Sequence, residues 1–206
     1  METKNLIQGT EEWLETRIGK VTASRVADVM AKTKSGYSTS RANYMAEKVA
    51  EILTGQAPEH FTNSAMQHGT ETEPVARNHY EHITGRIVSE VGLICHPTIE
   101  RLAGSPDGVM SDRGLEIKCP YTATHIETLL KGTVKKQYVI QMQVNMMCTG
   151  LKKWDFMSFD NRLPDNLSTY IKTFEYDDEL AKEIESEVVK FNAELEELLK
   201  KLQEIT

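Results

Sequence analysis

The stretch that decides the fold reads Ser105-Pro106-Asp107-Gly108-Val109-Met110-Ser111-Asp112-Arg113-Gly114-Leu115-Glu116-Ile117-Lys118. Proline and glycine at its start predict a turn that presents Asp107 at the edge of a strand. Residues 109–110 and 115–117 then form the two strands of a hairpin around 111–114. Because side chains alternate along a strand, Glu116 and Lys118 point to the same face. The hairpin therefore brings two carboxylates and one ammonium into one small volume.

This charged cluster predicts a metal site. Two close carboxylates repel each other unless a cation or proton lies between them, and hard oxygen ligands suit Mg²⁺ or Mn²⁺. Such a cation holds a phosphate oxygen and lowers the pKa of a bound water, while Lys118 offsets the charge that builds on the phosphate. The cluster predicts phosphodiester hydrolysis. The pattern Asp-x(8)-Glu-x-Lys alone does not exclude a charged surface hairpin, but Gln141-Met142-Gln143 on the next helix can face the same pocket.

The elements around this hairpin predict an α/β fold with a small, mixed central sheet flanked by helices. Apolar periodicity and capping residues place helices at 10–17, 22–30, 40–53, 64–84, 122–130, 136–148 and 178–204. Short β-type runs lie at 87–96, 101–104, 108–110, 115–119, 154–159 and 169–176, and 32–39 is a polar loop. Pro74 is expected to interrupt the helix at 64–84, which places Glu73 at a kink or helix start. With no linker or repeat, 1–206 reads as one domain, with a catalytic core at about 64–160.

The net charge of −7 does not exclude a DNA partner, because the negative charge is concentrated at one end of the chain. Residues 178–206 contain nine acidic residues and four lysines, so the rest of the chain carries a net charge of only −2. Local basic clusters decide which partners bind. Those clusters contain Arg17, Lys20, Arg25, Lys32, Lys34 and Arg41, and later Lys131, Lys135 and Lys136.

Several classes of protein are excluded by composition. The three cysteines form no Cys-x-x-Cys pair, which argues against a zinc ribbon, an iron–sulfur cluster or a disulfide framework. No apolar run approaches the roughly 18–20 residues that a membrane span needs. The first residues lack the basic flank and apolar run of a signal peptide, so a cytoplasmic location is expected.

Several motifs in order resemble the phage lambda exonuclease and YqaJ viral recombinase family, which belongs to the PD-(D/E)xK nuclease superfamily. The hairpin segment from Ser105 to Pro120 is similar to the core of that family. The stretch Glu12-Trp13-Leu14-Glu15-Thr16-Arg17-Ile18-Gly19-Lys20-Val21-Thr22-Ala23-Ser24 is similar to its N-terminal motif. Gly69-Thr70-Glu71-Thr72-Glu73 and Gln141-Met142-Gln143 match two further family motifs. The resemblance spans roughly residues 9–160 and implies a restriction-endonuclease-like core.

The resemblance also implies roles for individual residues. Asp107 and Glu116 would hold a two-metal Mg²⁺ site with the Ile117 carbonyl and Glu73, and Lys118 would be the catalytic lysine. Gln141 would lie beside the attacking water. Arg17, Ser24 and Thr22 would bind the 5′-terminal phosphate of DNA, as a planar guanidinium and nearby hydroxyls can do. Met66 would be an apolar wedge that separates the strands.

On this resemblance the chain is expected to be a 5′-to-3′ exodeoxyribonuclease that leaves 3′ single-stranded tails on double-stranded DNA. The family forms ring-shaped homotrimers and hands the tail to a phage single-strand annealing protein for recombination, and a membrane partner is not expected. Two alternatives remain open. One is a site- or structure-specific endonuclease on the same core; the other is a non-catalytic scaffold that binds DNA ends.

Each candidate also has a simpler interpretation. Glu73 can be a solvated carboxylate at a helix start, Arg17 a surface arginine, and Met66 a core residue. We expect His79 and His82, three residues apart, to lie on a solvated helix face rather than bind metal. Cys119 is expected to be a small buried hydrophobic residue, and the helix at 178–204 is expected first of all to pack on the core.

Overall fold

The computed structural model describes residues 3–4, 6–57 and 64–205, and the hairpin at 108–118 lies in one of its two four-stranded sheets. That sheet has the order β10-β9-β8-β7. Its strands β8 and β9 run parallel, whereas the pairs β7–β8 and β9–β10 are antiparallel, as a mixed sheet requires. The strands are β7 (Gly108–Val109), β8 (Gly114–Lys118), β9 (Lys153–Phe159) and β10 (Thr169–Glu175).

A second four-stranded sheet within the described residues was not predicted. It has the order β1-β5-β6-β2 and contains β1 (Thr3–Lys4), β5 (Leu93–Cys95), β6 (Leu102–Gly104) and β2 (Val21–Thr22). Its parallel pair β2–β6 places Val21 opposite Leu102 and Thr22 opposite Ala103. The register brings the segment that follows Arg17 next to the start of the hairpin segment at Ser105. The small, mixed central sheet that was predicted around the hairpin is the one formed by β7 to β10.

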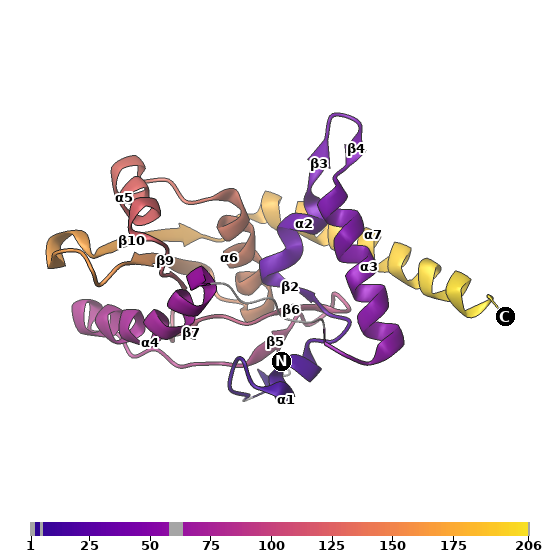
Figure 1. Ribbon diagram of the computed structural model, residues 1–206, viewed down its shortest axis with the longest axis horizontal. Coiled ribbons are helices and arrows are strands. Elements are labelled where there is room, and N and C mark those ends of the chain that lie inside the picture. The colour runs from indigo at the N-terminus through magenta and orange to yellow at the C-terminus, as the bar shows by residue number, and fades with distance from the viewer. Residues whose placement is uncertain (1–2, 5, 58–63, 206) are drawn as a thin grey trace.

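The helices flank these sheets, with α6 at the centre of the molecule (Figure 1). Helix α6 packs against α2, α7, β6 and the short 3-10 helix η1. Its side chains from Ile140 to Cys148 are mostly buried, including Met142 and Val144 at 0% exposure. The helices are α1 (Glu11–Thr16), α2 (Val26–Met30), α3 (Thr39–Thr54), α4 (Ser64–Thr84), α5 (Thr122–Lys131), α6 (Lys136–Thr149) and α7 (Asp178–Gln203), with 3-10 turns η1 (Ala23–Arg25) and η2 (Asp165–Leu167).

Helix α4 continues through Pro74, so the predicted interruption was wrong. Ala76 and Tyr80 are completely buried against Leu115 and Ile117 of β8, in the core cluster that this helix shares with the sheet. Burial of an aromatic and an aliphatic face offsets the single backbone hydrogen bond that a proline removes. Glu73 thus lies inside a long helix and not at its start.

Helix α3 buries polar residues where an apolar stripe was expected. It begins at Thr39 after the N-cap Ser38, close to the predicted start. Its buried residues are Arg41, Tyr44, Lys48, Val49 and Glu51, whereas the apolar Leu53 is 54% exposed.

The polar segment 32–39 forms a hairpin where a loop was expected. Strands β3 (Lys32–Thr33) and β4 (Gly36–Tyr37) pair with each other and project from the body of the molecule (Figure 1). Glu187 of α7 holds this hairpin, because its carboxylate accepts hydrogen bonds from Lys32 Nζ at 2.5 Å and Tyr37 Oη at 2.7 Å. Such a long-range tie is not visible in the local sequence.

Two other predictions have clear outcomes. The run 87–96 forms a strand only at Leu93–Cys95, with one bridge between Ser89 and Val109. The closing amphipathic helix is confirmed, because Ile184, Val188 and Phe191 of α7 are completely buried in the main core. Across the described ranges, no helix is both long and apolar enough to cross a membrane.

Candidate active site

The turn before β7 and the strand β8 bring Asp107, Glu116 and Lys118 together. The backbone N–H of Ile117 donates to Asp107 Oδ2 at 2.7 Å, which attaches the turn to the strand. Lys118 Nζ lies 2.5 Å from Glu116 Oε1. The Glu116 side chain is completely buried, and apart from this ion pair its two oxygens have no hydrogen-bond partner among the described residues. The structure therefore places the three residues as the hairpin geometry requires.

Glu73 joins the acidic cluster from α4 through Arg77, which the sequence analysis missed. Arg77 Nη2 donates to Glu73 Oε1 at 2.7 Å, and Arg77 Nε donates to the Asp107 carbonyl at 3.2 Å. Arg77 also pairs with Glu90 at 3.0 Å. One guanidinium therefore connects two of the predicted metal-site residues. Its position four residues after Glu73 on a helix is the signal that could have identified it.

Crowding and burial perturb the pKa values of Glu73, Asp107, Glu116 and Lys118. Burial raises the pKa of Glu116 to about 8, and the neighbouring carboxylates of Asp107 and Glu73 add to the shift. Burial and the charge of Asp107 raise the pKa of Glu73 to about 7, and burial also raises the pKa of Asp107. Burial alone lowers the pKa of Lys118, but Glu116 and Asp107 hold it above its ordinary value. Perturbed groups of this kind are typical of functional sites.

The residues present fit a divalent cation whose coordination is completed by water. In the described part of the chain, no three acidic, histidine or cysteine side chains converge on one point. Glu116 faces Lys118, Glu73 faces Arg77 and Asp107 accepts from Ile117. Mg²⁺ commonly uses only one or two carboxylates and keeps several waters. Glu116 is chemically suited to be such a ligand, because its two buried oxygens meet only Lys118 among the described residues.

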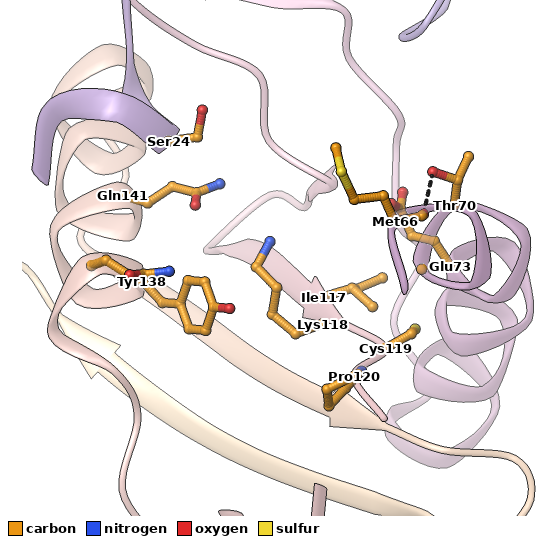
Figure 2. A pocket seen from close by; sticks show the side chains of 12 residues that line it. Ser24, Met66, Thr70, Glu73, Ile117, Lys118, Cys119, Pro120, Tyr138 and Gln141 are labelled. Atoms are coloured by element: carbon orange, nitrogen blue, oxygen red, sulfur yellow. Dashed lines mark hydrogen bonds between the residues drawn. The ribbon is translucent and has the colours of Figure 1, made fainter. Parts of the chain in front are cut away.

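A cavity of about 550 Å³ opens in front of Lys118. Figure 2 shows the Lys118 ammonium pointing into it, between Tyr138 and Gln141 of α6 on one side and Met66 and Glu73 of α4 on the other. Tyr138 was not predicted; its ring centroid lies 5.3 Å from Lys118 Nζ. Its position one helical turn before Gln141 is the signal that could have pointed to it.

A second cavity of about 170 Å³ adjoins the first. Ser24 and Gln141 line both cavities, and the second is also lined by Gln8, Trp13, Arg17, Thr22, Ala23, Ser105 and Asp107. Arg17, Thr22 and Ser24, the three predicted phosphate-binding residues, therefore meet in one place. The two cavities therefore share Ser24 and Gln141 as lining residues, with Arg17 lining one cavity and Lys118 the other.

Arg17 is held in place by neutral neighbours. Its Nη1 donates to Ser105 Oγ at 2.9 Å, and its guanidinium carbon lies 4.1 Å from the centroid of the Trp13 ring. Trp13 Nε1 in turn donates to the Gly92 carbonyl at 2.8 Å. Burial lowers the pKa of Arg17 from its ordinary value. Within the described ranges no carboxylate forms an ion pair with Arg17, although the charge of the Glu51 carboxylate acts on it from a greater distance and raises its pKa. Ser105, which the sequence analysis assigned only to a turn, is a further member of this site.

The simpler interpretations of single residues have mixed outcomes. Met66 is 51% exposed and lines the Lys118 cavity, so it is not a core residue. His82 is exposed as expected, but His79 is half-buried, with its ring centroid 5.2 Å from that of Phe159. Cys119 is confirmed as a buried residue, and burial raises the pKa of its thiol to about 12.

Comparison with known proteins gives concordant matches. A family model described as the YqaJ-like viral recombinase domain matches residues 12–152. The crystal structure of an alkaline exonuclease from Laribacter hongkongensis is 52% identical in sequence, with a TM-score of 0.87 over 94% of this chain and 96% of that chain. The same exonuclease in complex with dAMP has a TM-score of 0.88 over the same shares of the two chains.

A more distant match shows the fold alone. A phage-related exonuclease from Haemophilus somnus is 18% identical, with a TM-score of 0.72 over 89% of this chain and 96% of that chain. No curated protein matches the chain. The structural matches confirm the predicted α/β fold class with a restriction-endonuclease-like core.

Proposed function

The chain belongs to the YqaJ-like viral recombinase family, and we propose that it is an exonuclease that degrades linear double-stranded DNA from its 5′ ends. The expected family resemblance is thereby confirmed, and the similar enzyme from Laribacter hongkongensis is an alkaline exonuclease. One observation carries the proposal: the Arg17 cavity and the Lys118 cavity share Ser24 and Gln141. A terminal phosphate held by Arg17 would leave the first phosphodiester bond beside Lys118.

The residues divide this work between binding and chemistry. Arg17, Ser105, Ser24 and Thr22 supply a guanidinium and hydroxyls to the terminal phosphate. Lys118 offsets the charge that builds on the scissile phosphate. Gln141, which lines both cavities, holds the attacking water between them.

The chemistry needs a cation, which we place at the buried Glu116 and the acidic groups near it. Asp107, Glu116, the Ile117 carbonyl and Glu73 would hold Mg²⁺, with Mn²⁺ as a substitute. When bound, Mg²⁺ polarises the phosphate and lowers the pKa of a coordinated water. In the metal-free protein the pKa values of the Glu73 and Glu116 carboxyl groups are raised. Cation binding is therefore expected to release protons from them.

Met66 supports a preference for duplex ends. This exposed apolar side chain lines the entrance to the Lys118 cavity. An apolar wedge placed between bases can unstack the first pair at a cost of a few kcal/mol. One strand would then enter the cavity while its complement is left as a 3′ single strand.

The proposed assembly and partner rest on the family resemblance. A homotrimeric ring would enclose the duplex, and a phage single-strand annealing protein would receive the 3′ strand. The acidic helix α7 is compatible with a DNA partner, because Glu187, Glu194 and Glu196 pair with Lys32, Arg41 and Arg101 of the same chain. Much of its negative charge is thus compensated within the protein.

The experiment that tests this function compares three DNA substrates in Mg²⁺: linear duplex with 5′ phosphate, linear duplex with 5′ hydroxyl, and closed circles. We expect rapid stepwise release of mononucleotides from the first, slower release from the second and none from the third. EDTA should stop the reaction. Discrete fragments from the circles would favour the alternative endonuclease. Binding of ends without any release of nucleotide would favour the non-catalytic scaffold.

A further inference from the structure

Helix α3 presents a buried polar face to the segment that carries Arg17. Tyr44, Lys48 and Glu51 are 0%, 4% and 3% exposed, and their spacing of four and three residues places them on one side of the helix. A helix in this position ordinarily buries apolar side chains. Burial of an ion pair is seldom favourable compared with apolar packing of similar volume. The free energy of folding therefore does not by itself explain why α3 buries polar residues at this face.

Every polar group of this face contacts the turn at residues 19–22 or supports a residue that does. Glu51 Oε2 accepts the backbone N–H of Gly19 at 2.8 Å, and Lys48 Nζ donates to Glu51 Oε1 at 2.5 Å. The Tyr44 hydroxyl accepts the backbone N–H of Thr22 at 3.2 Å and donates to the Lys20 carbonyl at 3.4 Å. The turn is thus hydrogen-bonded to α3 at three points.

The turn has little room to move away from these contacts. Gly19 has a φ of +68°, a conformation that glycine adopts without strain. A Cβ at this position would lie 2.9 Å from Ile52 Cγ1 of α3, so the backbone lies directly against that helix. Arg17 precedes this turn and Thr22 ends it, and both line the second cavity. The position of α3 therefore fixes the two ends of the phosphate-binding segment.

We propose that Glu51 and Tyr44 are positioning residues that orient Arg17 and Thr22 for the terminal phosphate, with Lys48 as the ion-pair partner of Glu51. This inference rests on the proposed end recognition and assigns Glu51 and Tyr44 a role that acts through Arg17 and Thr22. A charged acceptor forms a stronger and shorter hydrogen bond to a backbone N–H than a neutral one. Preorganisation of the clamp lowers the entropy that phosphate binding must overcome.

Two double variants separate the positioning role from simple stability. Lys48→Met/Glu51→Leu replaces the buried pair with apolar side chains of similar volume, which ordinarily preserves folding. Lys48→Met/Glu51→Gln also removes both charges but keeps an oxygen acceptor for Gly19. The matched control, Arg41→Met/Glu194→Leu, removes another pair that joins α3 to α7 away from this turn. Tyr44→Phe tests the second attachment independently.

The measurement is kcat/KM on duplexes with 5′ phosphate and with 5′ hydroxyl, expressed as a ratio, with the thermal midpoint of each variant recorded. We expect the Leu variant to lower the ratio about tenfold, as loss of one hydrogen bond to a charged group implies, by raising KM for the phosphorylated duplex. The ratio should fall less in Lys48→Met/Glu51→Gln, and it should keep the wild-type value in the control Arg41→Met/Glu194→Leu. Tyr44→Phe should lower the ratio in the same direction.

Three results would overturn the inference. The first is an unchanged ratio in both the Leu variant and Tyr44→Phe. The second is an equal loss on both substrates, which would indicate a merely structural role. The third is the absence of any phosphate preference in the wild type, which would also remove the proposed end recognition. The first two leave that proposed function intact, so the two failures are distinguishable.

Discussion

Raising the pH should destabilise the metal-free protein, because folding buries the Glu116 carboxyl. Its side chain is completely buried, and burial raises its pKa to about 8 from an ordinary value of 4.5. A carboxyl with a higher pKa in the folded state binds its proton more tightly when the protein is folded. Its favourable contribution is therefore fully present below about pH 4.5 and is lost as the pH rises to about 8.

The size of this effect follows from the shift. Each pKa unit corresponds to about 1.4 kcal/mol, so the difference between 4.5 and about 8 sets a ceiling of roughly 5 kcal/mol. The nearby ammonium of Lys118 favours the ionised form and is already included in that pKa. Small domains have unfolding free energies of about 5–15 kcal/mol. A loss of even a few kcal/mol is therefore measurable.

The assay is urea unfolding in EDTA at several pH values between 5 and 8.5, for the wild type and Glu116→Gln. Other acids act in the opposite direction; for example, Lys32 and Tyr37 hold the pKa of Glu187 below its ordinary value despite its burial. The difference between the two proteins cancels such effects. We expect the Gln variant to match the wild type near pH 5 and to be a few kcal/mol more stable at pH 8.5.

Mg²⁺ provides the internal check. Added at pH 8.5, it should restore much of the wild-type stability, because a cation beside Glu116 favours the ionised carboxylate. The Gln variant should respond far less. A difference between the two proteins that stays constant from pH 5 to 8.5 would refute the reasoning about Glu116. Equal stabilisation of both proteins by Mg²⁺ would refute its role as a ligand.

Three further predictions use activity and stability. Lys118→Ala should lower kcat at least about a hundredfold in single-turnover digestion, with DNA binding retained in Ca²⁺. Arg17→Lys, which keeps the charge but removes the planar fork, should lower kcat/KM on 5′-phosphorylated duplex by about 10–100-fold and leave 5′-hydroxyl duplex nearly unchanged. Met66→Ala should slow digestion of blunt duplex more than that of duplex with frayed 5′ ends. Because Met66 is half-exposed, calorimetry should show a stability change within about 0.5 kcal/mol.

The central hairpin was predictable because its information is local. Pro106 and Gly108 mark the turn, and the two-residue period of β8 fixes the relation between Glu116 and Lys118. The apolar residues Leu115 and Ile117 alternate with Glu116 and Lys118 along β8 and identify a buried strand. No distant contact is needed to predict that these charges share one site.

Elements that depend on distant partners were predicted less well. Strand β2 contains only two residues, and its pairing with β6 joins segments about eighty residues apart. The continuity of α4 through Pro74 depends on the burial of Tyr80 against the sheet. A strand of two residues is too short to show a periodic pattern in the sequence. In α4 the apolar pattern is too weak to outweigh the rule that proline interrupts a helix.

The same distinction explains the functional site. Arg17 and Ser105, 88 residues apart, line one cavity only because β2 and β6 are paired. The resemblance to a known family supplied that association, since no periodicity could. Lys48 and Glu51 lie at helical spacing typical of a solvated face, and their burial depends on a turn about thirty residues earlier in the chain. Because a sequence pattern describes one element at a time, the residues that orient Arg17 become visible only when α3 and that turn are seen together.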